Sequence, residues 1–218
     1  MSYKVILVGS SGLVGNQLLE ALIKSPEVSE IILLLRRPLK TKDNKIQQLL
    51  VNFDDLDSYA YEICGDIIFS CLGTSKAANP NAEDYRRVDL EYPIKLAKIG
   101  LKNGVSQFHI VSSLGANATS NNSYLRLKGE LEEKLKKMRF KSLHIYQPSL
   151  LRGSRKEFRI GEKLASIIFL LLNPLLVGPI KKYRSIKAET VASFILKQSL
   201  KDLKGIFTYP SIIIQKLA

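Results

Sequence analysis

Cysteines are scarce in this sequence, and low-complexity tracts and repeats are absent from it. Its 218 residues include only two cysteines, and we find no low-complexity tract and no repeat of fixed period. This argues against a disulfide-stabilised secreted domain and against a repeat protein. Neither Cys64 nor Cys71 has neighbours at metal-ligand spacing, so we expect buried, reduced thiols and no metal site. The first residues lead straight into a predicted strand without a signal-peptide pattern, which favours a cytoplasmic location.

Acidic residues are outnumbered by basic ones. The chain has 33 Lys and Arg against 20 Asp and Glu, a formal net charge of +13. Such an excess favours anionic ligands, acidic partners or a negatively charged surface. The basic residues are spread along the chain without a nucleic-acid recognition motif, so we do not expect nucleic-acid binding.

The sequence also lacks an apolar run long enough for a transmembrane helix. Its most apolar segment, residues 164–180, is shorter than the roughly 20 residues that a span needs. Asn173-Pro174 and Gly178-Pro179 interrupt it. We interpret the segment as a helix and loop that line a pocket. Because lysines flank it on both sides, peripheral contact with a membrane remains an alternative.

Strand-like and helix-like segments alternate along the chain. Short apolar runs predict strands at residues 4–8, 31–35, 45–51, 66–71, 107–112, 142–147 and 206–209. Apolar residues at helical spacing predict helices at residues 13–24, 84–102, 123–138 and 188–200. This order predicts an α/β fold with a doubly wound parallel sheet. We assign residues 1–218 to one domain, in which residues 151–186 and 201–218 form a small C-terminal lobe that covers the substrate.

The first predicted strand runs directly into a glycine-rich turn. Gly9 permits a tight turn, Gly12 a close backbone approach to a pyrophosphate, and Gly15 close packing of the helix on the strand. The start of that helix offers unpaired N–H groups to phosphates. The pattern predicts a Rossmann dinucleotide-binding site. Its residues are Gly9, Ser10, Ser11, Gly12, Leu13, Val14 and Gly15.

The end of the second predicted strand indicates which dinucleotide binds. Arg36 and Arg37 stand where an acidic residue would contact the ribose 2′-hydroxyl of NAD. Guanidinium groups instead offer paired donors to a 2′-phosphate, and one charge-assisted bond gives roughly a ten- to hundredfold preference. We therefore predict NADP(H) as cofactor, the alternative being an exposed basic pair without a ligand. By position, further adenosine contacts are expected from Asp54 or Asp55, Cys71, Leu72 and Gly73.

A tyrosine and a lysine predict a proton-transfer site. Tyr124 and Lys128 stand one turn apart on one helix face, and Ser112 and Ser113 end the preceding strand. An ammonium about 4 Å from a phenol favours the phenolate by roughly 4 kcal/mol at an effective dielectric constant near 20. Tyr124 can then exchange a proton with a substrate oxygen that a serine hydroxyl holds. The alternative is a solvated helix face without catalytic role.

These segments together resemble the short-chain dehydrogenase/reductase superfamily, in its atypical NADP-binding branch, and especially a group with human and bacterial members. The matching stretches are VGSSGLVG, LLRRP, FSCLGTS, YRRVDLEYPIKLAK, HIVSSLGA, YLRLKGELEEKL and QPSLLRG. The resemblance implies that Tyr124 donates and accepts the proton, that Lys128 acts on Tyr124 and touches the nicotinamide ribose, and that Ser113 faces the substrate. It also implies cofactor contacts from Leu150, Leu151 and Arg152.

Two positions depart from the superfamily pattern. Ser113 and Tyr124 are slightly closer in sequence than usual, so Ser112 is an alternative to Ser113. Asp89 stands where the superfamily often has an asparagine of its proton relay.

The sequence thus predicts an NADP(H)-dependent oxidoreductase that acts on a small carbonyl compound or alcohol. One alternative is a non-catalytic protein that senses the NADPH/NADP ratio. Another is a membrane-surface reductase of a lipophilic substrate, suggested by residues 164–180. The predicted Tyr124–Lys128 pair favours catalysis, because a sensor needs no activated phenol. The substrate and the oligomeric state do not follow from the sequence.

Overall fold

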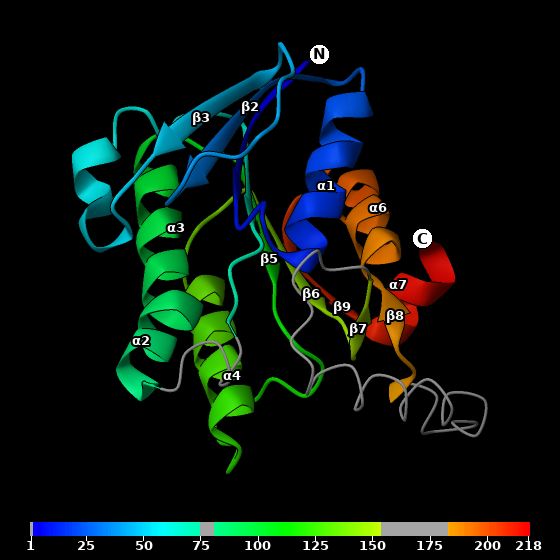
Figure 1. Cartoon of the computed structure of the whole chain (residues 1–218). Helices are drawn as coiled ribbons and strands as arrows, with labels where there is room; N and C mark the ends of the chain where they lie inside the picture. The colour runs from blue at the N-terminus through cyan, green and yellow to red at the C-terminus, as the bar shows by residue number, and fades with distance from the viewer. Residues whose placement is uncertain (1, 75–80, 154–182) are drawn as a thin grey trace.

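A seven-stranded, wholly parallel sheet forms the middle layer of the molecule (Figure 1). In the computed structural model, which describes residues 2–74, 81–153 and 183–218, the strand order is β3-β2-β1-β4-β5-β6-β9. The strands are β1 (Tyr3–Val8), β2 (Val28–Leu35), β3 (Ile46–Leu50), β4 (Ile67–Ser70), β5 (Gln107–Val111), β6 (Ser142–Gln147) and β9 (Gly205–Pro210). The predicted α/β fold with a doubly wound parallel sheet is confirmed.

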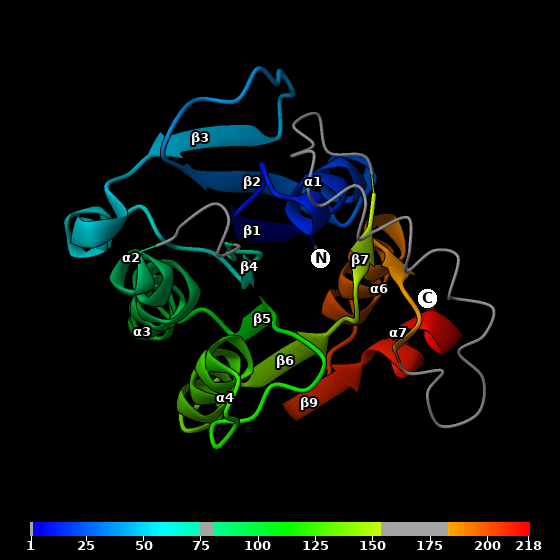
Figure 2. The same cartoon turned by 60° about the horizontal axis from the view of Figure 1, so that its bottom comes forward.

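Helices cover both faces of the sheet because neighbouring strand residues point to opposite sides. In β1, Val5 and Leu7 pack into one apolar core, whereas Ile6 and Val8 pack into the other. On the first face lie α1 (Leu13–Lys24), α6 (Ala188–Ser199) and α7 (Ser211–Leu217). On the second face lie η1 (Phe53–Tyr59), α2 (Ala82–Arg86), η2 (Arg87–Glu91), α3 (Tyr92–Lys102) and α4 (Ser123–Lys136), as Figure 2 shows.

Most predicted strands and helices are confirmed to within two residues. β2 is an exception, because it begins at Val28 instead of residue 31. The polar residues Ser29 and Glu30 interrupt the apolar pattern, yet Val28 is buried and pairs with Tyr3 of β1. The helices η1 and α7 were not predicted.

The single helix predicted for residues 84–102 is instead three consecutive helical segments. It starts earlier, where the side chain of Asn81 accepts a hydrogen bond from the N–H of Glu83 and caps α2. The middle segment, η2, is a π-helical turn, in which the N–H of Tyr92 bonds the carbonyl of Arg87. The next residue is Pro93, which has no N–H with which to form the α-helical bond to residue 89. We attribute the wider turn to this missing bond.

The C-terminal residues differ from the predicted lobe. Residues 201–218 do not form a separate unit, because β9 pairs in parallel with the whole of β6 and completes the main sheet. At the two ends of segment 151–186, β7 (Leu151–Arg152) and β8 (Ile186–Lys187) pair in a small sheet apart from the main one. The helix and loop predicted for residues 164–180 lie outside the described residues. Within 2–74, 81–153 and 183–218, no helix combines the length and the hydropathy of a membrane span.

Candidate active site

Most predicted site residues follow the carboxyl ends of six strands, including Asp54 after β3 and five groups after β2, β1, β4, β5 and β6. In a parallel sheet these ends share one edge, so the strand order β2-β1-β4-β5-β6 brings the segments that follow these strands side by side. The chain leaves β1 toward β2 and β3 on one side, whereas β4, β5 and β6 lie on the other. Ligands of such sheets bind where the direction reverses. Here that place lies between β1 and β4.

The glycine turn after β1 is shaped by close backbone contacts. Gly9 has φ of +81°, and a Cβ there would lie 2.6 Å from the carbonyl of Cys71, just after β4. At Gly15, a Cβ would lie 2.1 Å from the carbonyl oxygen of Gly9. Both positions therefore require glycine. The N–H of Gly12 donates to the carbonyl oxygen of Gly9, and a Cβ at Gly12 would lie 3.1 Å from the same oxygen, a much milder contact.

The first turn of α1 offers unsatisfied donors. Gly12 is its N-cap, no side chain caps the helix, and the first turn has no acidic residue. The Ser10 hydroxyl is buried and, within the described residues, has no hydrogen-bond partner. Buried polar groups normally have partners, and the positive end of a helix attracts anions. The turn and α1 therefore fit a phosphate-containing ligand. Ser11 is exposed, Leu13 half-buried and Val14 buried.

The arginine pair after β2 is exposed. Within the part of the chain that the structure describes, neither Arg36 nor Arg37 forms an ion pair or a side-chain hydrogen bond.

Asp54, in contrast, forms a hydrogen bond and an ion pair with neighbouring side chains. Its carboxylate accepts from the Tyr92 hydroxyl at 2.5 Å and lies 3.4 Å from the Arg87 guanidinium. Burial and this bond to Asp54 raise the pKa of Tyr92 to about 12.

Asp54 thus links η1 to α3, and its predicted contact with adenine stays a prediction. The other candidate, Asp55, accepts a hydrogen bond from Ser58.

Both cysteines are free thiols, but each is half-buried, not fully buried as predicted. Cys64 stands before β4 and Cys71 after it, so each lies at a rim of the sheet. Burial nevertheless raises the pKa of the Cys71 thiol to about 12, which makes it a poor nucleophile. The N–H of Cys71 donates to the carbonyl of Val8 and continues the pairing of β1 with β4 next to the glycine turn.

A buried ion pair connects η2 to α4. The ammonium of Lys128 lies 2.8 Å from Oδ1 of Asp89, and the two side chains are 3% and 0% exposed. Oδ2 of Asp89 accepts the N–H of Thr74 at 2.9 Å. Next to Thr74, Gly73 is exposed and Leu72 half-buried; a Cβ at Gly73 would lie 3.6 Å from Asp89. The carboxylate thus contacts two of the predicted site segments.

Tyr124 is half-buried at the beginning of α4. The side chain of Asn122 caps this helix by accepting the N–H groups of Tyr124 and Leu125. A second tyrosine, Tyr85 of α2, lies with its ring centroid 6.5 Å from that of Tyr124. Burial, followed by the charges of Asp89 and Tyr124, raises the pKa of Tyr85 well above its usual value. Tyr85 is therefore a neutral hydroxyl next to the predicted proton donor, and sequence reasoning missed it.

The two serines after β5 differ in their surroundings. Ser112 is buried and donates to the carboxylate of Glu132, which also accepts from the side chain of Gln147. Ser113 is half-buried, and within the described residues its hydroxyl has only a 3.5 Å contact with the Leu114 carbonyl. Ser112 is thus occupied inside the protein, whereas the hydroxyl of Ser113 remains available to a substrate.

A cavity brings two predicted cofactor residues together. It lies where the start of α1 meets β7 and β8, and it includes Leu13 and Arg152. The Nε atom of Arg152 is buried and, in the described part of the chain, unpartnered. Leu151 and Arg152 are half-buried, whereas Leu150 is exposed and does not line this cavity. Its other lining residues are Gln17, Gly153, Lys187, Ala188 and Glu189.

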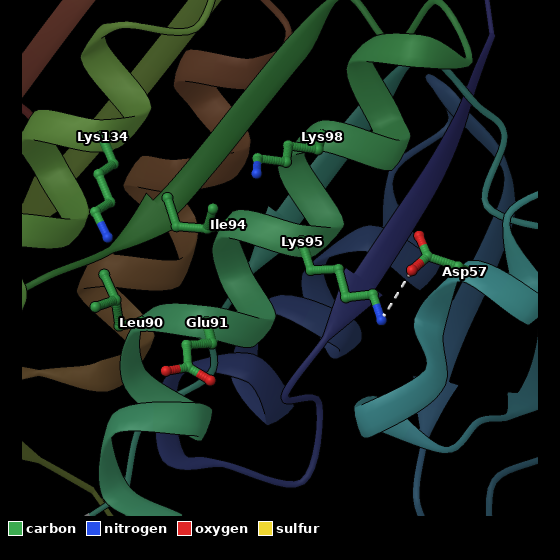
Figure 3. Close-up of a pocket in the computed structure, with 7 residues that line it drawn as sticks. All are labelled: Asp57, Leu90, Glu91, Ile94, Lys95, Lys98 and Lys134. Carbon is green, nitrogen blue, oxygen red and sulfur yellow. Dashed lines mark ion pairs between the residues drawn. The ribbon is translucent and has the colours of Figure 1, made fainter. Parts of the chain in front are cut away.

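A second concavity lies on the helical face formed by η1, η2, α3 and α4 (Figure 3). Lys95 spans part of it and forms an ion pair with Asp57 at 3.0 Å. Its other lining residues are Leu90, Glu91, Ile94, Lys98 and Lys134. None of these residues belongs to the glycine turn or to the Tyr124–Lys128 pair. We therefore do not assign the active site to this groove.

The sequence model described as the NAD dependent epimerase/dehydratase family matches residues 5–149. This span runs from β1 into the residues after β6 and includes the glycine turn, Asp89, Tyr124 and Lys128. The chain belongs to this family. The predicted resemblance to atypical short-chain dehydrogenases/reductases is thereby confirmed.

Curated relatives in the family extend over most of the chain. Protein HTATIP2 of Rattus norvegicus is 36% identical over 169 residues, which are 76% of this chain and 69% of the relative. A protein of Aspergillus terreus named fmp52-1, mitochondrial, is 30% identical over 208 residues, 92% of this chain and 89% of the relative. Because such relatives are named mitochondrial, the expected cytoplasmic location of this chain stays a prediction.

Solved structures share the fold at low sequence identity. The oxidoreductase ylbE from Lactococcus lactis has a TM-score of 0.66 at 19% identity and covers 98% of this chain and 96% of its own. The Bordetella bronchiseptica enzyme WbmH, solved in complex with NAD+, has a TM-score of 0.71 at 12% identity, with 96% of this chain and 75% of its own covered.

Proposed function

We propose that the protein is an NADP(H)-dependent oxidoreductase that acts on a small carbonyl compound or alcohol. The observation that carries the proposal is the grouping of three features at one sheet edge. These are the glycine turn with the start of α1, the exposed arginines after β2, and Tyr124 with the buried Lys128–Asp89 pair. Membership of an NAD-dependent family supports a nicotinamide dinucleotide as the ligand of the turn.

Each side chain has a role in this proposal. A bound nicotinamide would donate hydride to a substrate carbonyl carbon, or accept hydride from the carbon of an alcohol. Tyr124 supplies the proton to the carbonyl oxygen during reduction and removes it during oxidation. The Ser113 hydroxyl donates a hydrogen bond that holds this oxygen. Lys128 donates a hydrogen bond to the ribose that carries the nicotinamide.

A thermal-shift titration with NADPH, NADP+ and NADH tests the cofactor. A ligand that binds only the folded state raises the melting temperature, and at equal concentration the ligand with the lower Kd raises it more. We expect larger shifts from NADPH and NADP+ than from NADH at equal concentration. Equal shifts would contradict the NADP preference, and the absence of any shift would remove the dinucleotide site.

The arginine pair should account for this preference. Arg36→Ala and Arg37→Ala together are expected to weaken NADPH binding by at least roughly ten- to hundredfold, the effect of losing a single charge-assisted bond to the 2′-phosphate. NADH affinity should stay the same, since that ligand has no 2′-phosphate. The measurement is a fluorescence titration, with Arg139→Ala at another exposed arginine as the control. An equal loss of affinity for NADPH and NADH would show that the arginine pair does not bind the 2′-phosphate.

A further inference from the structure

Lys128 occupies an environment that is unfavourable for a lone ammonium. Its side chain is 3% exposed, and the carboxylate at 2.8 Å belongs to a residue without any exposure. Removing a charge from water is unfavourable unless a partner compensates it. The carboxylate comes from the π-helical turn η2, which lies next to α4 in the second helical layer. The position of the ammonium therefore depends on a residue from another element.

The two oxygens of Asp89 contact two different parts of the site. Oδ1 faces the ammonium of Lys128 on α4, and Oδ2 accepts the N–H of Thr74 in the loop after β4. Movement of this carboxylate would therefore displace both a helix side chain and a loop backbone. The loop follows Cys71, whose carbonyl packs against Gly9 of the glycine turn.

We propose that Asp89 is a positioning residue that holds the ammonium of Lys128 and the backbone of Thr74 in the one arrangement that receives the nicotinamide ribose. This inference rests on the proposed function, since it assumes that a nicotinamide dinucleotide binds at the glycine turn. Asp89 itself does not touch the reacting atoms and acts through Lys128.

The pairing also changes the electrostatic role of Lys128. A lone ammonium would present an uncompensated positive charge to this part of the site, but here the carboxylate of Asp89, 2.8 Å away, offsets much of that charge. The other titratable group on this side is Tyr85, which is neutral, while Glu132 one turn further along α4 is bonded to Ser112 and Gln147. Lys128 therefore contributes mainly as an oriented hydrogen-bond donor.

Binding of two ligands separates positioning from general damage. NADPH carries the nicotinamide ribose, whereas adenosine 2′,5′-bisphosphate has the 2′-phosphate but lacks that ribose. We expect Asp89→Asn to weaken NADPH about tenfold or more, the effect of losing one charge-assisted bond. Affinity for adenosine 2′,5′-bisphosphate should stay at the wild-type value. Both affinities are measured by isothermal titration calorimetry.

A double-mutant cycle adds a second readout. Lys128→Met should weaken NADPH binding as Asp89→Asn does. The double variant should bind NADPH no more weakly than Lys128→Met alone, because both substitutions remove the same contact, that of Lys128 with the ribose. If Asp89→Asn alone does not fold because it leaves the Lys128 ammonium buried without a partner, the double variant, which buries neither charge, is compared with the wild type for both ligands.

Four results would overturn the inference. Unchanged NADPH affinity in Asp89→Asn would mean that Lys128 does not need its partner. Equal weakening of both ligands would indicate structural damage without a specific role at the ribose. A further loss in the double variant beyond Lys128→Met would show that Asp89 does not act through Lys128. If the wild type binds neither ligand, the proposed function fails first, and this inference fails with it.

Discussion

Substitution Tyr124→Phe is expected to lower turnover by roughly a hundred- to ten-thousandfold, the usual contribution of a positioned proton donor. The ring remains, so packing against Tyr85 is kept and NADPH affinity should not change. The measurement is NADPH oxidation with a panel of small aldehydes and ketones, together with a fluorescence titration of NADPH. Loss of turnover with retained cofactor binding is the expected combination.

Two tyrosines serve as controls for this substitution. Tyr61→Phe changes a side chain that is 94% exposed, and it should leave both quantities unchanged. Tyr85→Phe removes the neighbouring hydroxyl and should retain far more turnover than Tyr124→Phe. If Tyr85→Phe abolishes turnover and Tyr124→Phe does not, the proton donor has been assigned to the wrong tyrosine. If the wild type binds NADPH but oxidises it with none of the panel, the sensor alternative gains support.

Local patterns in the sequence were sufficient for most of the fold. A strand buried on both faces appears as a continuous apolar run, as in residues 5–8 and 31–35, and all of these residues are buried. The glycine spacing was equally informative, because Gly9 and Gly15 are required by backbone contacts within a single turn and its neighbouring strand. Both features depend on residues that are close in sequence or on the burial of one segment.

The arrangement of the candidate site was only partly predictable, because it depends on contacts between distant segments. The choice between Ser112 and Ser113 depends on Glu132, whose carboxylate binds the first serine. The pairing of Lys128 with Asp89 depends on how α4 packs against η2. The spacing of Tyr124 and Lys128 in the sequence predicts neither the bond of Ser112 to Glu132 nor the ion pair of Lys128 with Asp89. Pro93, directly after the π-helical turn that carries Asp89, is a local signal for that turn in the sequence.

A ladder of aromatic and histidine side chains, buried on β5 and β6 and half-buried on β9, crosses these three strands. The rings of His109 and His144 stack with centroids 4.3 Å apart, and both residues are almost completely buried. His109 Nδ1 bonds the Tyr146 hydroxyl at 2.9 Å, and His144 Nδ1 bonds the Tyr209 hydroxyl at 3.1 Å. Among the residues that the structure describes, neither imidazole contacts an acidic side chain, which favours the neutral form of both. Their other nitrogens face Gln107 and Ser142, neither of which is charged.

This ladder predicts that the protein loses stability in mild acid. Burial, followed by the proximity of His144, lowers the pKa of His109 well below its usual value. Burial, followed by the charge of Lys201, lowers that of His144 to about 4. In the unfolded chain both titrate near 6.5. Above that pH neither state binds the protons, whereas below it only the unfolded state does, so stability falls as the pH decreases from about 6.5 toward 4.

The expected size is about 2 kcal/mol for each histidine at pH 5, since 1.5 pH units correspond to about 2 kcal/mol. The measurement is urea unfolding at pH 7.5 and pH 5.

Carboxylates also contribute to the change in stability between these pH values, so the informative quantity is the difference between wild type and His144→Gln. This variant keeps a side chain that can bond Ser142 or Tyr209 but removes the titrating imidazole. Between pH 7.5 and pH 5, the free energy of unfolding of this variant should fall by about 2 kcal/mol less than that of the wild type. An equal loss in both proteins would mean that His144 is already charged in the folded state or titrates without linkage to folding, and the buried ladder would not be the origin of acid sensitivity.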